Sequence, residues 1–295
     1  MQTQHAAVLG HPIGHTMSPF IQKRLFQLSG IPMEYQVLDL PDLAAGLPRL
    51  RQLDCFNVTI PYKQAILPFL DAVDPQAARF GSVNTVKVEG GRLTGYTTDG
   101  AGCRKALENH GLDFSGRVLL LGNGGAARAL AFEIAQCQRD PDLTIACRAG
   151  SQPKAVALAQ EVAGFLRERG DRGFRIEVQT YEELEGLCGC GVPKPEYDLL
   201  VNATSVGMYP HAGQSPVTGA VAARCHAVFD AVYNPAQTEL LRLAEEAGAV
   251  TVGGMEMLVY QAVAAHEAWY GTAFHPQDIR QLCRDAQAEL ARAFP

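Results

Sequence analysis

Short apolar runs alternate with longer amphipathic stretches along most of the chain. This alternation is typical of βαβ units, which build a parallel sheet covered by helices. The pattern therefore predicts an α/β protein. For the first third of the chain it predicts strands at residues 5–9, 35–40 and 56–60 and helices at 18–28, 43–53 and 63–70.

Two apolar segments that follow, residues 83–88 and 92–95, are separated by Glu89-Gly90-Gly91. A glycine pair between two strand-like segments favours a tight hairpin. We expect two antiparallel strands here, at the edge of the first sheet. That sheet is then mixed but mainly parallel.

A second alternating series begins near Gly102. It predicts strands at 118–121, 143–147, 175–179, 198–202, 227–232 and 250–252, and helices at 104–110, 126–138, 154–169, 238–247, 255–270 and 276–293. The segment 186–196 is rich in Gly, Pro and Cys, which is typical of a surface loop. Because 295 residues are about twice the common domain size, we expect two domains.

A glycine-rich turn follows the apolar run Val118–Leu121 and precedes a predicted helix, with the pattern Gly122-x-Gly124-x-x-Ala127. This is the dinucleotide-binding fingerprint in the strand–turn–helix context that it requires. Gly122 permits the turn, Gly124 lets the backbone approach a pyrophosphate, and Ala127 allows close helix–strand packing. The free N–H groups at the helix start would then face the diphosphate. The alternative is a glycine turn with a structural role only.

The end of the next predicted strand carries basic residues, Arg148 and then Lys154. A site that prefers NAD usually has an acidic residue at this point, whereas a cation suits the 2′-phosphate of NADP. We therefore expect NADP to be preferred. An ordinary surface arginine is the alternative interpretation of Arg148.

Three polar clusters lie at predicted carboxyl ends of strands in the first domain, where open α/β sheets bind ligands. These clusters are Gly10–Pro19, Asn57–Lys63, and Asn84 together with Tyr96–Gly102. They supply hydroxyls, amides, one ammonium and one carboxylate, a set that suits a small polyhydroxylated molecule.

Two residues of these clusters are candidates for acid–base chemistry, Lys63 and Asp99. Removal of a hydride from a carbinol carbon leaves a hydroxyl proton, which a lysine can accept while a carboxylate orients it. The alternatives are a solvated lysine at a helix start for Lys63 and a helix N-cap for Asp99.

Seven ordered motifs resemble those of shikimate dehydrogenases and the related quinate/shikimate dehydrogenases, over nearly the full length. They are Gly10–Pro19, Asn57–Lys63, Gly81–Thr85, Gly95–Gly102, Gly122–Arg128, Asn202–Gly207 and Gly254–Gln261. The resemblance implies NADP-linked, reversible reduction of 3-dehydroshikimate to shikimate in aromatic amino-acid (chorismate) biosynthesis. It also implies a substrate-binding domain of residues 1–101 and 256–295 and a Rossmann-type NADP-binding domain of residues 102–255, joined by helices around a cleft.

The same resemblance implies the site residues. The catalytic pair is Lys63 and Asp99. The substrate-binding residues are Thr16, Ser18, Asn57, Thr59, Lys63, Asn84, Asp99, Tyr233 and Gln261. The residues that bind NADP (NADPH) are Gly122, Asn123, Gly124, Gly125, Ala126, Arg148, Lys154, Thr204, Ala231 and Gly254.

Three departures from the usual pattern of this family affect four positions. Thr16 replaces a serine, which keeps the hydroxyl but adds a methyl group. Thr97 replaces an asparagine beside Asp99, and Cys147 and Ala149 replace polar neighbours of Arg148. These departures bear on two choices, shikimate against quinate and NADP against NAD.

Composition excludes several other classes of protein. The net charge of −6 argues against a nucleic-acid binder, which needs clustered Lys and Arg. The sequence has neither a signal peptide at its start nor an apolar run long enough for a membrane span, so we expect a cytoplasmic protein, monomeric or homodimeric. We expect the cysteines to be free and buried, Cys55, Cys137, Cys147 and Cys225 among them, and Cys188 and Cys190 to form no zinc site. No metal is expected, and His15 is expected to order its own loop.

Three other functions stay open at this point. A quinate/shikimate dehydrogenase with relaxed or NAD cofactor preference would oxidise quinate faster with NAD. A ligand sensor without catalysis would not need Lys63 and Asp99. A folate-linked dehydrogenase of similar plan would not need the hydroxyl pair Thr16 and Ser18.

Overall fold

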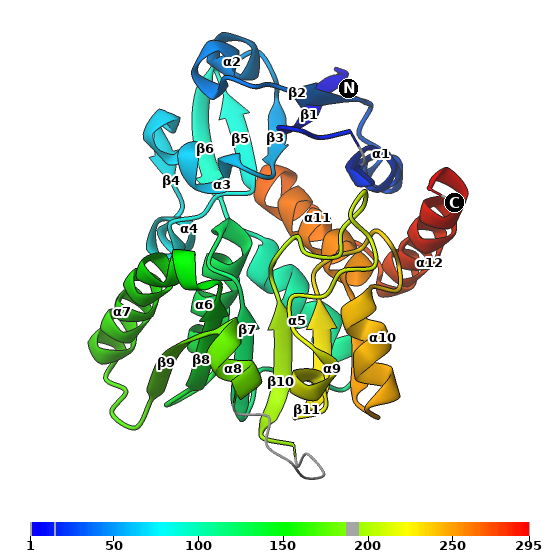
Figure 1. The fold of residues 1–295 in the computed structure, drawn as a ribbon. Helices are drawn as coiled ribbons and strands as arrows, with labels where there is room; N and C mark the ends of the chain where they lie inside the picture. The colour runs from blue at the N-terminus through cyan, green and yellow to red at the C-terminus, as the bar shows by residue number, and fades with distance from the viewer. Residues whose placement is uncertain (1, 15, 187–194, 295) are drawn as a thin grey trace. The chain divides into compact units, whose positions relative to one another are not determined.

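The computed structural model describes residues 2–14, 16–186 and 195–294 (Figure 1). The chain divides into two compact units, Met1–Gly102 with Leu258–Pro295, and Cys103–Met257. Each unit has its own six-stranded sheet. The predicted α/β class, with one mixed and one parallel sheet, is confirmed.

The sheet of the first unit has the strand order β2-β1-β3-β5-β6-β4. Its parallel part comprises β1 (Gln4–Gly10), β2 (Met33–Asp39) and β3 (Cys55–Val58). The predicted hairpin is present as β5 (Thr85–Glu89) and β6 (Arg92–Tyr96), with β5 antiparallel to both β3 and β6. Gly90 and Gly91 take positive φ values of 58° and 78°, as a primed hairpin turn requires. A two-residue strand, β4 (Ala72–Val73), adds to β6 and was not predicted.

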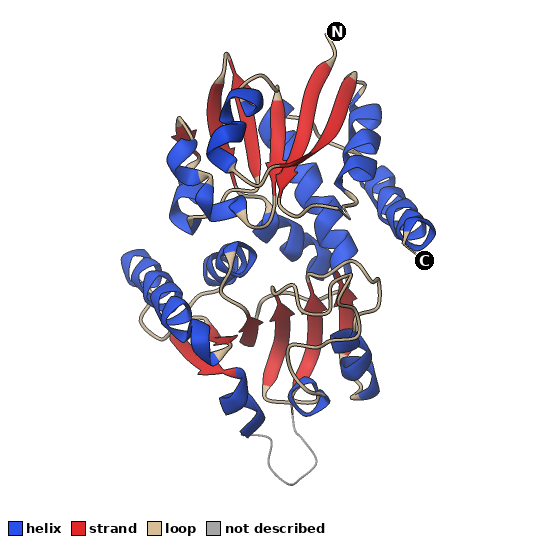
Figure 2. Cartoon of the chain, turned by 45° about the horizontal axis from the view of Figure 1, so that its top comes forward, coloured by secondary structure: helices blue, strands red, loops and turns tan. Residues whose placement is uncertain are grey.

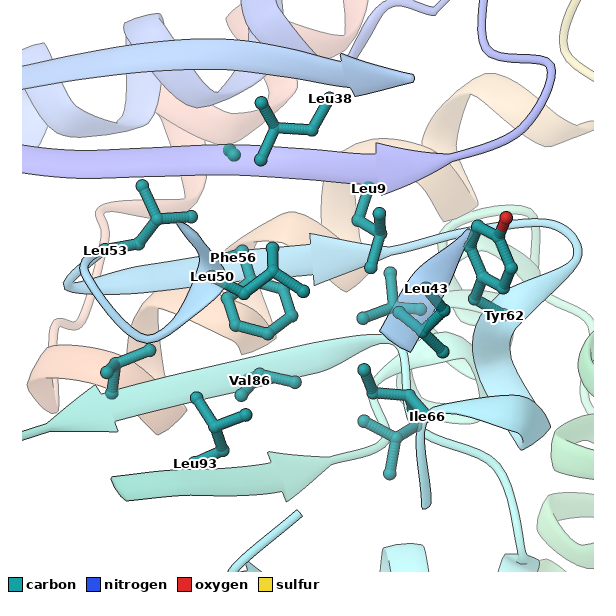
Figure 3. Packing of buried hydrophobic residues seen from close by; sticks show 14 of the residues in the cluster. Leu9, Leu38, Leu43, Leu50, Leu53, Phe56, Tyr62, Ile66, Val86 and Leu93 are labelled. Carbon is teal, nitrogen blue, oxygen red and sulfur yellow. The ribbon is translucent and has the colours of Figure 1, made fainter. Parts of the chain in front are cut away.

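The helices of this unit cover both faces of its sheet. They are α1 (Ser18–Ser29), α2 (Leu43–Leu50), α3 (Tyr62–Ala65), α4 (Pro75–Phe80), α12 (Pro276–Ala293) and the parts of α5 (Asp99–Asn109) and α11 (Gly254–Tyr270) that fall within it. On one face, Leu9 and Phe56 join a buried cluster with Leu43 of α2 and Tyr62 of α3 (Figure 3).

On the opposite face, Ala6 and Cys55 pack against Phe26 of α1 and Trp269 of α11. Successive strand residues point to opposite faces of a sheet. Asn57 therefore shares the face of Cys55, which α1 and α11 cover.

The second unit has an entirely parallel sheet, drawn as red arrows in Figure 2. Its strand order is β12-β11-β10-β7-β8-β9. Its strands are β7 (Arg117–Leu121), β8 (Asp142–Cys147), β9 (Arg175–Thr180), β10 (Tyr197–Asn202), β11 (Cys225–Asp230) and β12 (Val250–Gly253). This order is that of the doubly wound dinucleotide-binding fold. The chain first moves outward from β7 to β9 and then returns to the other side of β7. The switch point of the sheet therefore lies between β7 and β10.

Consecutive buried residues along β7 show that both faces of this sheet are covered. The helices of the unit are α6 (Gly125–Cys137), α7 (Gln152–Arg169), α8 (Tyr181–Gly186), α9 (Gly219–Ala222) and α10 (Glu239–Glu246), beside most of α5. Leu119 and Leu121 of β7 share one buried cluster with residues of α8, α9 and α10.

Several predicted elements differ in the structure. The helix predicted at 63–70 is the short α3 followed by a 3₁₀ turn, Leu67–Phe69, because Pro68 lacks an N–H and disfavours a helical residue before it. The helix predicted at 104–110 already begins at Asp99. The short helices α4, α8 and α9 were not predicted.

The six cysteines that the structure describes are free, as predicted. The prediction of a buried thiol is wrong for Cys137, which is exposed because it is the last residue of α6. Cys188, Cys190 and His15 lie outside the described residues, as does most of the predicted loop 186–196. Among the described residues, every helix is too short or too polar to span a lipid bilayer.

Candidate active site

The centre of the polar cluster in the first unit is an ion pair between Lys63 and Asp99. Lys63 lies in α3, directly after the end of β3, and Asp99 is the first residue of α5. Lys63 Nζ donates to Asp99 Oδ2 over 2.6 Å, and the two side chains are 15% and 5% exposed. The pair is therefore shielded from bulk water, which strengthens its electrostatic interaction. Lys63 is therefore not a solvated lysine, and the Asp99 carboxylate binds a side chain outside its own helix.

Asn84 connects this ion pair to the surrounding chain segments. Its Nδ2 group lies 2.9 Å from Asp99 Oδ1, 2.9 Å from Thr98 Oγ1 and 3.2 Å from Gln261 Oε1. Its Oδ1 accepts the backbone N–H of Thr98 over 2.8 Å. Both oxygens of Asp99 thus have a donor, one from Lys63 and one from Asn84, and the carboxylate is held in one orientation.

Gln261 enters the same cluster from α11, far away in the sequence. Its Nε2 group donates to the carbonyl of Leu258 over 2.8 Å, which leaves Oε1 directed toward Asn84. The predicted residues Lys63, Asn84, Asp99 and Gln261 are therefore brought together by direct contacts within one unit.

The hydroxyl pair forms a second group at the start of α1. Thr16 Oγ1 donates to Ser18 Oγ over 3.1 Å, and the Ser18 N–H donates to Thr16 Oγ1 over 3.2 Å. Both residues are partly exposed. Thr16 and Ser18 stand at the start of α1, so their hydroxyls lie at the positive end of the helix dipole. The arrangement offers donors suited to an anion.

Asn57 and Thr59 stand near the end of β3. Thr59 still belongs to the ladder, since its N–H donates to the carbonyl of Leu9 over 2.8 Å. Asn57 is buried, and its Oδ1 accepts from Gln22 Nε2 over 2.9 Å and from the Tyr35 hydroxyl over 2.8 Å. Asn57 Nδ2 has no hydrogen-bond partner among the described residues.

In the second unit, the predicted glycine turn lies at the switch point of the sheet. Gly122 has a φ of +108°, and a Cβ atom there would lie 3.0 Å from Thr204 Cγ2. Gly124 is the N-cap of α6, and a Cβ atom at this position would have no neighbour within 4 Å. Gly122 is required by the backbone itself, whereas Gly124 leaves open space beside the helix start. Such space suits a diphosphate.

Further predicted residues border this turn. Asn123 Nδ2 donates to the carbonyl of Ser151 over 2.8 Å. Thr204 Oγ1 donates to Asn202 Oδ1 over 2.8 Å and accepts the N–H of Val206 over 3.2 Å. Gly125 and Ala126 form the first turn of α6. The Asn123 contact ties the turn after β7 to the segment after β8, and the Thr204 contacts order the segment after β10.

Arg148 and Lys154 are both exposed. Arg148 directly follows β8, and its carbonyl accepts the N–H and the hydroxyl of Ser151. Its guanidinium has no ion pair within the described part of the chain. The position and the free charge suit a bound phosphate group.

Ala231 and Tyr233 follow β11, and Gly254 follows β12. A Cβ atom on Gly254 would lie 2.4 Å from the carbonyl oxygen of Ala231, so only glycine fits at this close approach. Ala231 also donates its N–H to the carbonyl of Asn202 over 2.9 Å. Tyr233 belongs to the second unit, in the segment after β11.

A buried carboxyl that sequence analysis missed lies behind these loops. Asp230 accepts from Asn202 Nδ2, from the N–H of Val232 and from the Thr238 hydroxyl, over 2.9, 3.0 and 2.6 Å. Burial raises the pKa of Asp230 to about 6 despite these donors. This residue orders the loops after β10 and β11.

The described residues contain no group of three or more His, Cys, Asp or Glu side chains that could hold a metal ion. His11 contacts Asp39 instead, with Nδ1 2.6 Å from Oδ1, and this contact lowers the pKa of Asp39.

Comparison with known proteins identifies the family. The family model described as "Shikimate dehydrogenase substrate binding domain" matches residues 8–86. The shikimate dehydrogenase (NADP(+)) of Moorella thermoacetica is 39% identical over 289 residues, covering 95% of this chain and 92% of that protein. The corresponding enzyme of Methanothermobacter thermautotrophicus is 38% identical over 275 residues, covering 92% of each chain. The chain belongs to the shikimate dehydrogenase family.

A solved structure of this family agrees in fold. Shikimate 5-dehydrogenase from Thermus thermophilus, in complex with NADP(H) and shikimate, superimposes with a TM-score of 0.80 at 32% identity. The match covers 96% of this chain and 99% of that one. The resemblance to shikimate dehydrogenases seen in the sequence motifs is thereby confirmed.

Three residues that support Asn57 in this member of the shikimate dehydrogenase family were not predicted from the sequence. Gln22 and Tyr35 contact Asn57 directly, and His266 Nε2 lies 3.0 Å from Gln22 Oε1. One signal for Gln22 was available: it is a polar residue four positions after Ser18 on the apolar face of α1 that also holds Ile21, Leu25 and Phe26.

Proposed function

We propose that this chain is an NADP-dependent shikimate dehydrogenase that reversibly reduces 3-dehydroshikimate to shikimate. The observation that carries the proposal is the shielded Lys63–Asp99 pair, with Asn84 and Gln261 in direct contact, within a chain of this family. Its partners are small molecules, shikimate and NADP, and the chain acts as a monomer or a homodimer.

The substrate-binding role belongs to the first unit. Thr16 and Ser18 would receive the substrate carboxylate, since their hydroxyls stand at the N-terminus of α1, where an anion is favoured. Thr59, Asn84 and Gln261 would contact the ring hydroxyls. By family resemblance, Asn57 and Tyr233 are assigned to the same ligand.

The fit of the second unit to NADP rests on its own geometry. The pyrophosphate would lie against Gly122–Ala126, where no Cβ atom obstructs the helix start at Gly124. The exposed Arg148 and Lys154 would face the 2′-phosphate. Thr204, Ala231 and Gly254 border the same edge of the sheet. When bound, NADPH supplies the hydride that reduces the substrate carbonyl carbon.

Lys63 and Asp99 handle the proton that accompanies this reduction. In the direction of shikimate formation, Lys63 Nζ donates a proton to the oxygen of the carbonyl being reduced. In the reverse direction, the same nitrogen accepts the hydroxyl proton. Asp99 Oδ2 holds Nζ in place, and Asn84 fixes the carboxylate through Oδ1. General acid–base catalysis of this kind contributes about 10²–10⁴-fold to a rate.

A four-way assay tests the proposed function. Oxidation of shikimate and of quinate is followed by nicotinamide absorbance, each with NADP and with NAD. We expect the highest kcat/KM for shikimate with NADP. Faster oxidation of quinate with NAD would instead assign the chain to the quinate/shikimate dehydrogenases, and no turnover in any combination would indicate a ligand sensor.

A further inference from the structure

The first unit contains a buried network of hydrogen-bonded side chains next to its candidate substrate-binding residues. His266 Nε2 lies 3.0 Å from Gln22 Oε1, Gln22 Nε2 donates to Asn57 Oδ1 over 2.9 Å, and the Tyr35 hydroxyl donates to the same oxygen. Gln22, Asn57 and His266 are 1%, 6% and 0% exposed. The residues come from α1, β3 and α11, so the network links three elements on one face of the sheet.

The protonation of His266 determines which groups donate and which accept in this hydrogen-bond network. The ring is enclosed by aromatic side chains, with the ring centroid of Phe26 at 4.5 Å and that of Trp269 at 5.6 Å. Burial lowers the pKa of His266 to about 4, so the ring is neutral near pH 7 and carries one N–H. Nδ1 has no hydrogen-bond partner among the described residues.

An unpaired acceptor in an apolar environment is more common than an unpaired N–H. The proton therefore belongs on Nε2, which donates to Gln22 Oε1. Gln22 then presents its NH₂ group to Asn57, and Asn57 must present Oδ1 in return. The second donor to that oxygen, the Tyr35 hydroxyl, favours the same orientation.

Because of these hydrogen-bond directions, the NH₂ group of Asn57 points away from Gln22 and Tyr35. Asn57 Nδ2 is buried and unpartnered among the described residues. A buried amide N–H without an acceptor is costly, by about 1–3 kcal/mol. This position therefore calls for an acceptor that the described protein atoms do not supply.

The location of Asn57 indicates which acceptor it meets. Gln22 follows Ser18 by one helical turn, so both lie on the same face of α1. Asn57 precedes Thr59 by two residues, so both lie on the same side of β3 and its extension. The contact between Gln22 and Asn57 is thus one helical turn away from Ser18 and two strand residues away from Thr59. It lies closer to the protein interior than the hydroxyl groups of these two residues.

We propose that Gln22, supported by His266, is a positioning residue that locks the Asn57 amide with its N–H donors toward the substrate carboxylate. This inference rests on the proposed function, since it assumes that shikimate is the ligand. It adds a neutral donor to the hydroxyls of Thr16 and Ser18. The interior of the protein thereby contributes to recognition of the anionic end of the substrate.

The test compares two ligands, shikimate and its methyl ester, which lacks the negative charge. Their dissociation constants are measured by calorimetric titration for wild type, Gln22→Met and Asn57→Asp. Gln27→Met is the matched control, because Gln27 lies on the exposed face of the same helix. Shikimate KM and kcat are measured in parallel, together with the melting temperature.

We expect both variants to weaken shikimate binding by about tenfold or more, the effect of one hydrogen bond to a charged group. Asn57→Asp keeps the shape of the side chain but replaces the donors by a second oxygen, which repels a carboxylate. Binding of the methyl ester should weaken less than that of shikimate in both variants. The KM of NADP should stay close to wild type in both variants, and Gln27→Met should behave like wild type in every measurement.

Equal weakening for the acid and the ester would overturn the inference, because it would mean that Asn57 Nδ2 meets a water molecule or a different substrate group. Unchanged dissociation constants with a lower melting temperature would mean that Gln22, Asn57 and His266 stabilise the fold and do not position a substrate contact. If Gln22→Met does not fold, the isosteric Asn57→Asp variant decides alone. Failure of wild type to bind shikimate would refute the proposed function itself, before any variant is compared.

Discussion

The polar centre of the first unit and the glycine turn of the second are built in different ways. Lys63, Asp99 and Asn84 are fixed by side-chain hydrogen bonds between separate segments. The turn at Gly122 and Gly124 depends on backbone conformation and on the absence of side chains. Substitutions in the first unit should therefore change chemistry with little effect on the backbone. In the second unit, conformation and binding should change together.

Among substitutions of the residues that surround Lys63 and the cofactor turn, the largest effect should come from removing the charge that holds Lys63. In Asp99→Asn the side chain keeps its shape, but the carboxylate that orients Lys63 Nζ is lost. We expect kcat for shikimate oxidation to fall by about 10²–10³-fold, within the usual range of acid–base catalysis. Steady-state assays check this, and Asp278→Asn, at an exposed position of α12, should retain wild-type rates. A loss below tenfold would mean that Asp99 does not orient the proton donor.

His266 in the first unit and Asp230 in the second are both buried, and the two should shift stability with pH in opposite directions. Burial lowers the pKa of His266 from 6.5 to about 4. Between these values the unfolded state binds the extra proton, so the stability due to neutral His266 is complete above pH 6.5 and is lost as the pH falls toward 4. Burial raises the pKa of Asp230 from 3.8 to about 6, so its contribution is complete below pH 3.8 and is lost as the pH rises through 6.

Urea unfolding of wild type, His266→Gln and Asp230→Asn across this pH range measures both effects. The difference between wild type and each variant should change by about 1 kcal/mol per pH unit, with opposite signs for the two residues. The single tryptophan, Trp269, reports unfolding of the first unit, and circular dichroism reports both. Slopes of the same sign would contradict the assignment of one of the two pKa shifts.

The two glycines of the turn should separate folding from cofactor binding. Gly122→Ala places a side chain at a φ of +108° and 3.0 Å from Thr204 Cγ2, and should lower the free energy of unfolding by about 1–3 kcal/mol. Gly124→Ala meets no atom within 4 Å, so it should lower stability less than Gly122→Ala while weakening NADP binding. Thermal melting and cofactor titration test both variants. Equal destabilisation by the two substitutions would refute the distinction.

The smallest effect concerns Arg148, which is expected to contact the 2′-phosphate of NADP. Arg148 is exposed and follows β8, so Arg148→Ala should not alter the fold. We expect the KM of NADP to rise about tenfold, as for loss of one charge-assisted contact, while the KM of NAD stays unchanged. An unchanged KM for NADP would remove Arg148 from the cofactor site.

The difference between local and long-range contacts explains which parts of the two sites could be predicted from the sequence. The glycine turn is local, so its strand, turn and helix can be read from adjacent residues such as Gly122 and Ala127. The motif around Lys63 could likewise be found, although Pro68 ends its helix earlier than the apolar pattern indicates. By contrast, Gln22 and His266 are 244 residues apart, and no local pattern reveals their contact. Asp230 was missed for a related reason, because a carboxyl at a strand end is ordinarily exposed.

The central claim is that Lys63 transfers the proton in shikimate oxidation, and the most direct test separates rate from affinity. The measurement is kcat with NADP together with the dissociation constant of shikimate, for wild type, Lys63→Ala and the exposed control Lys23→Ala. We predict that Lys63→Ala loses about 10²–10⁴-fold in kcat and only a few-fold in affinity, the pattern of a lost transition-state interaction. Retained kcat with a large loss of shikimate affinity would contradict this account and assign Lys63 to binding alone.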